Sequence, residues 1–153
     1  MHSPDELTAR FRERGMKVTP QRLAVFEALY GDEGHPTADV IWDRVRDRMS
    51  TVSLRTVYQA LNDLVELGEV QTVDVGNGAV RFDPNLAAHD HFVCRSCERV
   101  HDVMSTRPRL VSPYAAGGDG GTIGDGENGD AATQYTVEAA EVIFRGLCPA
   151  CGG

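Results

Sequence analysis

The sequence is short of the features that mark secreted and membrane proteins. Its 153 residues include only four cysteines and one tryptophan, and aromatic residues make up 7% of the chain. No apolar run approaches the roughly 20 residues that a membrane-spanning helix needs. Residues 1–6 have neither the basic nor the apolar stretch of a secretory signal. The sequence therefore predicts a soluble, cytoplasmic protein of one or two small domains.

The chain also lacks an excess of positive charge and the common enzyme motifs. A net charge of −8 argues against a polycation that coats nucleic acid, although DNA binding depends on a local patch rather than on the total. Neither a nucleotide-binding glycine fingerprint nor a nucleophile elbow occurs. The one notable basic cluster lies within residues 10–22, and a solvated helix face would explain it equally well.

Helical patterns fill the first part of the chain. Residues 5–14 form a first short helix, and the last of the set runs over about residues 54–67 with a buried stripe at helical spacing. A third helix is expected to start after Thr37, and its residues Val40, Ile41 and Val45 are expected to face inward. The later helices each follow a hydroxyl residue placed to cap the first turn, namely Thr19, Thr37 and Ser53.

Strand patterns follow the helices. Residues 69–75 and 79–82 alternate around Gly76-Asn77-Gly78, which is a hairpin signal. Helices followed by a hairpin are the order of a winged helix-turn-helix, in which the exposed face of the last helix enters the DNA major groove. Arg pairs with guanine, and Asn or Gln with adenine. Candidates on that face are Arg55, Tyr58, Gln59 and Asn62, unless they are ordinary solvent-facing residues.

Beyond this unit, Asp83-Pro84-Asn85 predicts a break in the chain because proline interrupts the strand. We expect a domain of residues 1–83, a hinge at 84–88 and a second domain of residues 89–153. Further strands are indicated at residues 91–94, 100–104 and within 135–147. Residues 112–134 are rich in glycine and acidic residues without Lys or Arg, which predicts a flexible loop. The expected fold class is α+β.

Two Cys-x-x-Cys pairs, Cys94/Cys97 and Cys148/Cys151, have the spacing of a tetrahedral zinc site. Four protein thiolates leave no open position, so the zinc would be structural. A redox dithiol is less favoured, because the thioredoxin-like setting that it requires is missing. The first pair is followed by Glu98, where glycine is usual.

A second site is indicated by nitrogen and oxygen donors. His89 and His91 share one face of a strand because side chains alternate with a period of two. Asp102 would return beside them on the next strand, and Asp83 lies across the hinge. His35, at a helix start, is more often a cap than a ligand. Imidazole and carboxylate donors suit iron(II), manganese(II), zinc or nickel.

Together these motifs resemble the ferric uptake regulator family. The resemblance covers nearly the whole chain except residues 105–134. It is carried by residues 15–22 (Gly-Met-Lys-Val-Thr-Pro-Gln-Arg), 35–38 (His-Pro-Thr-Ala), 55–58 (Arg-Thr-Val-Tyr), the His89-x-His91-x-x-Cys94-x-x-Cys97 stretch and Gly146-Leu147-Cys148-x-x-Cys151.

The resemblance implies a metal-dependent transcriptional repressor rather than an enzyme. Its winged helix would read a palindromic operator in double-stranded DNA, and its C-terminal domain would form a homodimer. The implied ligands are Cys94, Cys97, Cys148 and Cys151 for structural Zn²⁺, and His35, Asp83, His89, His91 and Asp102 for regulatory Fe²⁺ or Mn²⁺. Lys17 corresponds to a residue near the minor groove, Tyr58 to the tyrosine of the recognition helix, and Thr56 lies in the same matching motif.

The branch of the family is indicated by Asp102. Iron-uptake members tend to carry Glu at this position, and peroxide-sensing members carry Asp. The ending Glu138–Cys148 also resembles actinobacterial oxidative-stress regulators, so we expect peroxide to be the signal that oxidises a histidine ligand and releases DNA. An iron-uptake, or a nickel or zinc, regulator is the nearest alternative. A metal-dependent enzyme and a protein-binding zinc ribbon are alternatives of other classes.

Overall fold

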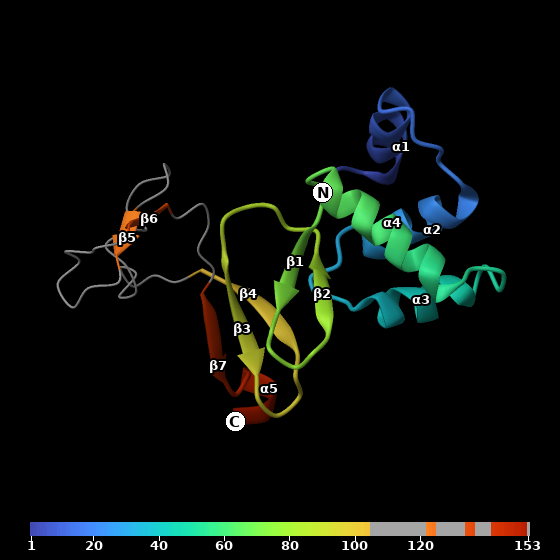
Figure 1. Cartoon of the computed structure of the whole chain (residues 1–153). Helices are drawn as coiled ribbons and strands as arrows, with labels where there is room; N and C mark the ends of the chain where they lie inside the picture. Colours follow the sequence, from blue (N-terminus) through green and yellow to red (C-terminus); the bar gives the residue numbers. More distant parts are fainter. Residues whose placement is uncertain (105–121, 125–133, 137–141, 153) are drawn as a thin grey trace.

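The computed structural model describes residues 1–104, 122–124, 134–136 and 142–152. Four helices group on one side of the molecule (Figure 1): α1 (Pro4–Glu13), α2 (Pro20–Leu29), α3 (Ala38–Arg46) and α4 (Leu54–Glu66). Each helix begins after a hydroxyl side chain that accepts a hydrogen bond from the first turn, which satisfies an otherwise unpaired backbone N–H. These N-caps are Ser3, Thr19, Thr37 and Ser53, so the expected caps are confirmed.

The helices enclose an apolar core that includes Phe11, Phe26, Ile41 and Leu61. The expectation for Val40 is wrong, because its side chain is 41% exposed while Ile41 and Val45 are buried. The buried stripe of α3 therefore runs through Ile41 and Val45, which leaves Val40 at its edge.

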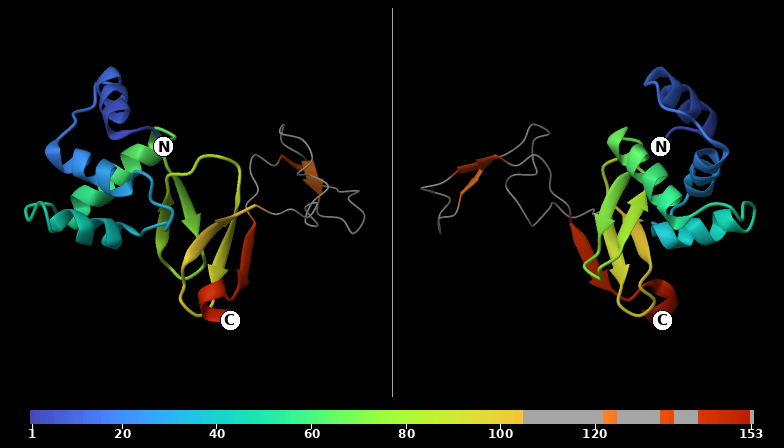
Figure 2. Two further views of the ribbon diagram at one scale, coloured as in Figure 1. Left: turned by 180° about the vertical axis from the view of Figure 1, so that it is seen from behind. Right: turned by 45° about the vertical axis from the view of Figure 1, so that its right-hand side comes forward.

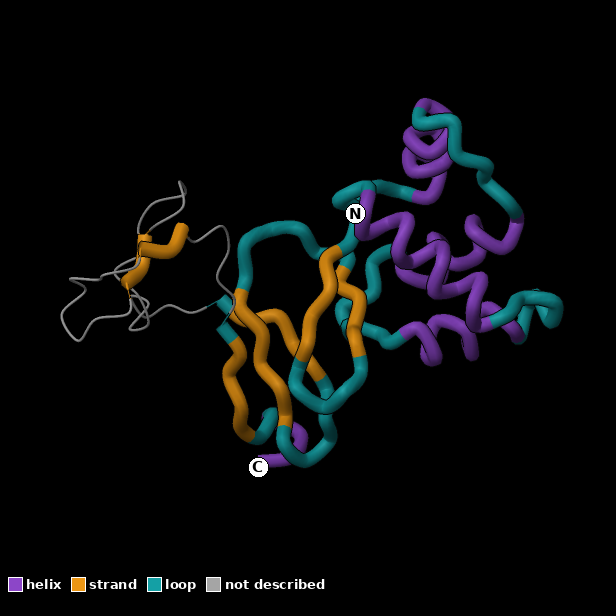
Figure 3. The backbone as a smooth tube through the Cα atoms, in the orientation of Figure 1, coloured by secondary structure: helices purple, strands orange, loops and turns teal. Residues whose placement is uncertain are grey.

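A hairpin lies between the helices and a second sheet (Figure 3). Strand β1 (Gln71–Asp74) pairs antiparallel with β2 (Val80–Asp83). The two faces of this hairpin pack against different hydrophobic cores. Phe82 packs into the helical core, whereas Val73 belongs to a smaller cluster shared with the second sheet. The hairpin thus joins the two halves of the molecule through its own side chains.

The second sheet has the strand order β4-β3-β7 (Figure 2). Strand β3 (Asp90–Cys94) pairs antiparallel with β4 (Val100–Val103) and parallel with β7 (Ile143–Gly146). A single turn of helix, α5 (Pro149–Gly152), ends the described chain beneath this sheet. The parallel pairing returns the C-terminal Cys pair to the first Cys pair, because Cys94 is in register with Gly146.

Most of the expected flexible loop at residues 112–134 lies outside the described residues. The described residues of this part of the chain include strand β5 (Thr122–Gly124), which pairs antiparallel with β6 (Gln134–Thr136). The sequence interpretation did not include this pairing. None of the helices in the described ranges has the length and apolar character needed to cross a membrane. The α+β fold class is confirmed.

Candidate metal centres

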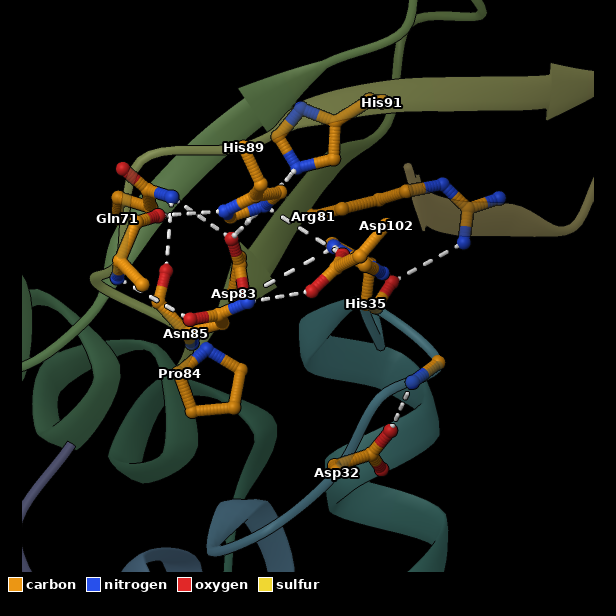
Figure 4. Close-up of polar contacts among 12 residues, drawn as sticks. Asp32, His35, Gln71, Arg81, Asp83, Pro84, Asn85, His89, His91 and Asp102 are labelled. Carbon is orange, nitrogen blue, oxygen red and sulfur yellow. Dashed lines mark hydrogen bonds and ion pairs between the residues drawn. The ribbon is translucent and has the colours of Figure 1, made fainter. Parts of the chain in front are cut away.

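Five side chains converge where the helical half meets the second sheet (Figure 4). Their ligand atoms all lie within 4.8 Å of one another. The group is the one expected from the sequence: His35, Asp83, His89, His91 and Asp102. In the register of β3 and β4, His91 stands directly opposite Asp102, which places the two side chains on one face of the sheet.

His35 reaches the cluster from the loop before α3. Its backbone is in the left-handed region, with φ of 49°, which costs a residue with a Cβ about 1 kcal/mol or more. Two contacts to β2 hold the loop there. The amide of Phe82 donates to the carbonyl of Pro36 at 3.0 Å, and Arg81 Nη1 donates to the carbonyl of His35 at 3.2 Å. A strained backbone held in place at a cluster of donors is typical of a functional site.

The two carboxylates are oriented by amide side chains that sequence reasoning missed. Gln71 Nε2 donates to Asp83 Oδ2 at 2.8 Å. Asn85 Nδ2 donates to Asp102 Oδ2 at 2.6 Å, and the Asn85 backbone amide donates to Asp83 Oδ1 at 2.7 Å. Asn85 belongs to the turn signal after the proline, but nothing in the sequence marks Gln71. Its role comes from hairpin register, which places it opposite Asp83.

His89 fixes its own tautomer. Its Nδ1 lies 2.7 Å from the carbonyl oxygen of Ala87, and because a carbonyl only accepts, Nδ1 carries the proton. In the neutral imidazole, Nε2 therefore presents a lone pair, and it lies 2.9 Å from His91 Nε2 and 3.1 Å from Asp83 Oδ2. Donor atoms bound to one metal through bonds of about 2.1 Å lie about 3.0 Å apart in an octahedron and about 3.4 Å apart in a tetrahedron. These spacings fit a shared cation.

The electrostatics of the cluster also favour a cation. Burial lowers the pKa of His35 and outweighs the charges of Asp83 and Asp102, which raise it. Neither ring nitrogen of His35 has a hydrogen-bond partner, although Nε2 lies 2.7 Å from Asp102 Oδ1. A neutral imidazole between carboxylates leaves negative charge in a largely buried site, and a divalent ion would balance it.

The four cysteines form a second cluster, where the β3–β4 turn meets α5. All are free thiols, and Cys97 Sγ lies 3.8 Å from Cys148 Sγ. A disulfide would require about 2.05 Å. The edge of a tetrahedron with zinc–sulfur bonds of about 2.3 Å is about 3.8 Å. The spacing fits zinc.

Hydrogen bonds and neighbouring sulfurs shift the pKa values of Cys94 and Cys151 in opposite directions. The amide of Cys148 donates to Cys94 Sγ at 3.4 Å and, with the amides of Cys97 and Ser96, lowers the pKa of Cys94 to about 6. At Cys151 a hydrogen bond from Ser96 favours the thiolate, but the sulfurs of Cys148 and Cys97 outweigh it and raise the pKa to about 11. Sulfurs this close hold several negative charges only around a metal ion.

Arg81 connects the surroundings of both clusters. Glu98, directly after the second cysteine, adopts φ of 57° where the sequence pattern usually has glycine. The guanidinium of Arg81 donates through Nη1 to the carbonyl of His35 and through Nη2 to the carbonyl of Glu98, at 3.2 and 3.3 Å. One side chain therefore contacts both non-glycine residues that have positive φ among the described residues. Figure 4 shows Arg81 and His35 of this set.

Access to the His/Asp cluster runs past Asp102. Its side chain is 29% exposed, whereas those of His35, Asp83 and His89 are 1%, 2% and 4% exposed. A pocket of about 600 Å³, bordered by the loop after α2 and by Asn85, opens onto Asp102. Asp102 is therefore the member of the cluster that faces this pocket.

The candidate DNA-facing residues lie on the outer side of the helical half. Lys17, Arg55, Gln59 and Asn62 are exposed, and Tyr58 is 42% exposed. Arg55, Thr56 and Gln59 line one hollow of about 390 Å³ with residues of α2. Thr56 is half-buried, and its hydroxyl lies 2.8 Å from that of the N-cap Ser53, so it has a role inside the helix turn as well.

Known proteins resemble this chain in sequence and in fold. A model of the ferric uptake regulator family matches residues 13–112. The peroxide-responsive repressor PerR of Staphylococcus epidermidis is 33% identical over 101 residues, which are 66% of this chain and 67% of that protein. The structure of the Campylobacter jejuni peroxide stress regulator has a TM-score of 0.60 at 25% identity and covers 99% of this chain and 100% of that one. A zinc-bound manganese uptake regulator also has a TM-score of 0.60 at 25% identity, covering 69% and 78%.

A buried His/Asp cluster beside a winged helix, with a separate four-cysteine cluster, defines the class of metal-responsive regulators. The chain belongs to the ferric uptake regulator family. Members of this family are transcription regulators that bind DNA as dimers, and peroxide-responsive repressors are among the relatives of this chain.

Proposed function

We propose that this protein is a metal-dependent transcriptional repressor that releases its operator in response to peroxide. The observation that carries the proposal is the convergence of five donors from both halves of the molecule. His35 and Asp83 belong to the helical half and its hairpin, whereas His89, His91 and Asp102 belong to the second sheet and the segment before it. The proposed division is a DNA-binding domain of residues 1–83, a hinge at 84–88, and a dimerisation and metal-binding domain of residues 89–153.

A divalent ion held by these five residues would supply the positive charge that joins the two halves. His35 would then fix the loop before α3, and Asp83 the end of the hairpin, against His91 on β3 and Asp102 on β4. In a homodimer this sets the separation of the two α4 helices, which must match half-sites of a palindromic operator. Shifting such an equilibrium from 1:99 to 99:1 needs about 5.5 kcal/mol of differential binding.

Zinc is the proposed ion of the four-cysteine cluster. Cys94 ends β3 and Cys97 lies in the turn that follows, whereas Cys148 precedes α5 and Cys151 lies within it. Zinc there would tie the end of the chain permanently to the sheet that carries the histidines. The His/Asp cluster, which has no sulfur donor, suits Fe²⁺ or Mn²⁺ instead.

The DNA surface is the outer face of α4 with the turn before α2. Arg55, Tyr58, Gln59 and Asn62 would face bases in the major groove, with Thr56 beside them, and Lys17 would lie near the minor groove. The exposure of this face supports the assignment, since the same helix buries Val57 and Leu61 on its other side.

The proposed signal is peroxide, which reaches the cluster past the partly exposed Asp102. Iron(II) there would supply the electrons that reduce peroxide beside the imidazoles. The chain itself contributes the pocket that admits a small oxidant and the tautomer of His89 that keeps a nitrogen available as a donor. Relatives named as peroxide-responsive repressors and peroxide stress regulators support this branch over iron uptake.

A DNA-binding titration tests the proposal. A DNA duplex selected from a randomised library by the manganese-loaded protein is titrated with the zinc-containing protein plus Fe²⁺ or Mn²⁺, each with and without hydrogen peroxide. We expect binding with either metal and a loss after peroxide only with iron. His91→Ala should abolish the metal response, whereas His101→Ala, on the neighbouring strand and outside the cluster, should retain it. Undiminished binding by His91→Ala would contradict the site, and release by metal removal but not by peroxide would indicate an uptake regulator.

A further inference from the structure

Arg81 stands beside the His/Asp cluster without supplying one of its five donors. On β2 it lies two residues before Asp83, and because strand side chains alternate, both side chains share one face of the hairpin. Phe82, between them, packs into the helical core on the other face. Arg81 is half-buried, and its Nε is buried without a hydrogen-bond partner among the described residues. Its hydrogen bonds are made by the two terminal nitrogens of the guanidinium.

One of these hydrogen bonds fixes the backbone of a cluster residue. Arg81 Nη1 donates to the carbonyl of His35 at 3.2 Å (Figure 4). His35 has φ of 49°, a conformation that is disfavoured for a residue with a Cβ and that other contacts must therefore maintain. A return to negative φ would turn the Cα–Cβ bond, and with it the imidazole, away from its present place. Arg81 thus holds a donor residue whose backbone would otherwise favour another conformation.

The other hydrogen bond reaches the second sheet. Arg81 Nη2 donates to the carbonyl of Glu98 at 3.3 Å, in the turn between β3 and β4. These two strands carry His91 and Asp102. One guanidinium therefore joins the backbone of His35 to the sheet that supplies other donors of the cluster. The planar fork of an arginine, with its two terminal nitrogens, suits two separate acceptors.

We infer that Arg81 is a positioning residue of the regulatory metal site, which holds His35 in the orientation that a bound divalent ion requires. It acts through His35 rather than as a ligand, because its guanidinium is positively charged and only donates hydrogen bonds. A donor that is already in place need not be ordered when the ion binds, and this raises the affinity. The inference rests on the proposed function, because it requires that the His/Asp cluster binds a divalent ion.

Charge and position predict opposite effects when Arg81 is replaced. A guanidinium beside the cluster repels a cation, so electrostatics alone predicts tighter metal binding once the charge is removed. Loss of positioning predicts weaker binding. Replacing a group that orients a metal ligand typically lowers the metal affinity about 10–100-fold. The direction of the change in the dissociation constant therefore separates the two effects.

The test measures the Mn²⁺ dissociation constant of the zinc-containing protein by competition with a fluorescent chelator. Arg81→Met should weaken Mn²⁺ binding about 10–100-fold. Arg81→Lys keeps the charge but places its donors on one nitrogen, so it should weaken binding as well. Arg145→Met is the matched control. Arg145 Nη2 donates to the carbonyl of Val75 at 2.7 Å and so also joins the second sheet to the end of the hairpin, but this hydrogen bond does not involve His35. This variant should bind Mn²⁺ like the wild type.

A double-mutant cycle tests whether Arg81 acts through His35. In His35→Gly the imidazole is absent, so its orientation no longer matters. Adding Arg81→Met to this variant should therefore not weaken Mn²⁺ binding further. A general structural role of Arg81 would instead weaken binding by the same factor with and without His35.

Three results would overturn the inference. The first is a Mn²⁺ dissociation constant that is unchanged or lower in either Arg81 variant, provided that circular dichroism shows it folded; Arg81→Lys decides where Arg81→Met does not fold. The second is an equal weakening in Arg145→Met, and the third is a weakening by Arg81→Met that persists in His35→Gly. These outcomes are distinct from failure of the proposed function, in which the wild type would bind no Mn²⁺ beyond that taken up by His91→Ala.

Discussion

Replacing His35 by glycine should change the stability of the metal-free protein little but remove most of its stabilisation by a bound metal. In the metal-free protein His35 is unfavourable in two respects: its backbone has φ of 49°, and its buried ring nitrogens make no hydrogen bond. Relief of the left-handed backbone contributes about 1 kcal/mol or more, and removal of an unsatisfied buried polar group about 1–3 kcal/mol. The added freedom of the unfolded chain, about 1 kcal/mol, and the loss of packed ring atoms oppose these gains.

Because these gains and losses are of similar size, the metal-free variant should lie within about 2 kcal/mol of the wild type. The metal response, by contrast, should be largely lost. At a Mn²⁺ concentration of about 100 times the wild-type Kd, the metal stabilises the wild type by about 2.7 kcal/mol. Loss of one donor that weakens binding about 100-fold would reduce this to about 0.4 kcal/mol.

Urea denaturation with Mn²⁺ and with no regulatory metal, zinc being retained in both, measures both effects. Glu98→Gly is the matched control, since Glu98 has φ of 57° and its carbonyl is bound by the same Arg81 side chain. Relief of the left-handed backbone should stabilise Glu98→Gly by a similar amount, and Mn²⁺ should stabilise this variant as much as the wild type. A His35→Gly protein that is markedly less stable without metal, or that keeps the full response, would refute the reasoning.

Three other substitutions test the surrounding structure. Cys97→Ser should lose the zinc and unfold the second sheet while the helical half stays folded, since structural zinc contributes about 10–16 kcal/mol in peptides; a folded, zinc-free sheet by NMR would contradict this. Burial raises the pKa of Glu69, but hydrogen bonds from His2 outweigh it and lower the pKa. The excess stability of the wild type over Glu69→Gln should therefore be complete above about pH 5 and shrink as the pH falls below about 4, and a pH-independent difference would argue against it. Gly146→Ala places a Cβ 3.1 Å from the Phe92 ring and should lower the free energy of unfolding, measured by urea denaturation, by about 1–3 kcal/mol. An unchanged free energy of unfolding would contradict this and would mean that the ring moves aside freely.

Local features of this fold were predictable from sequence because they depend on near neighbours. A hydroxyl residue before a helical stretch caps it whatever the rest of the chain does, so Thr19, Thr37 and Ser53 were identifiable. The turn at residues 76–78 was identifiable for the same reason. Val40 shows the limit, because which flank of an amphipathic helix is covered depends on elements distant in sequence.

The candidate metal site likewise has a part that was predictable from the sequence and a part that was not. The donor residues were found from motif spacing and family resemblance, but their supports were not. Gln71 acquires its contact with Asp83 from hairpin register, and Arg81 bridges two carbonyls that are far apart in sequence. On α4, Gln59 Nε2 donates to Asp63 Oδ1 at 3.0 Å, and this pair was predictable in principle because residues four apart on a helix face each other. The contact of Arg22 with Asp63 was not predictable, because Arg22 comes from another helix.

The central claim is that metal occupancy of the His/Asp cluster and operator binding are coupled. Coupling between two binding equilibria is reciprocal, so whatever factor Mn²⁺ adds to operator affinity, operator DNA must add to Mn²⁺ affinity. The direct measurement is the Mn²⁺ dissociation constant of the zinc-containing protein with and without saturating operator duplex. The account predicts tighter manganese binding on DNA, by the same factor that manganese gives to DNA binding. A manganese affinity that is indifferent to the operator would contradict it.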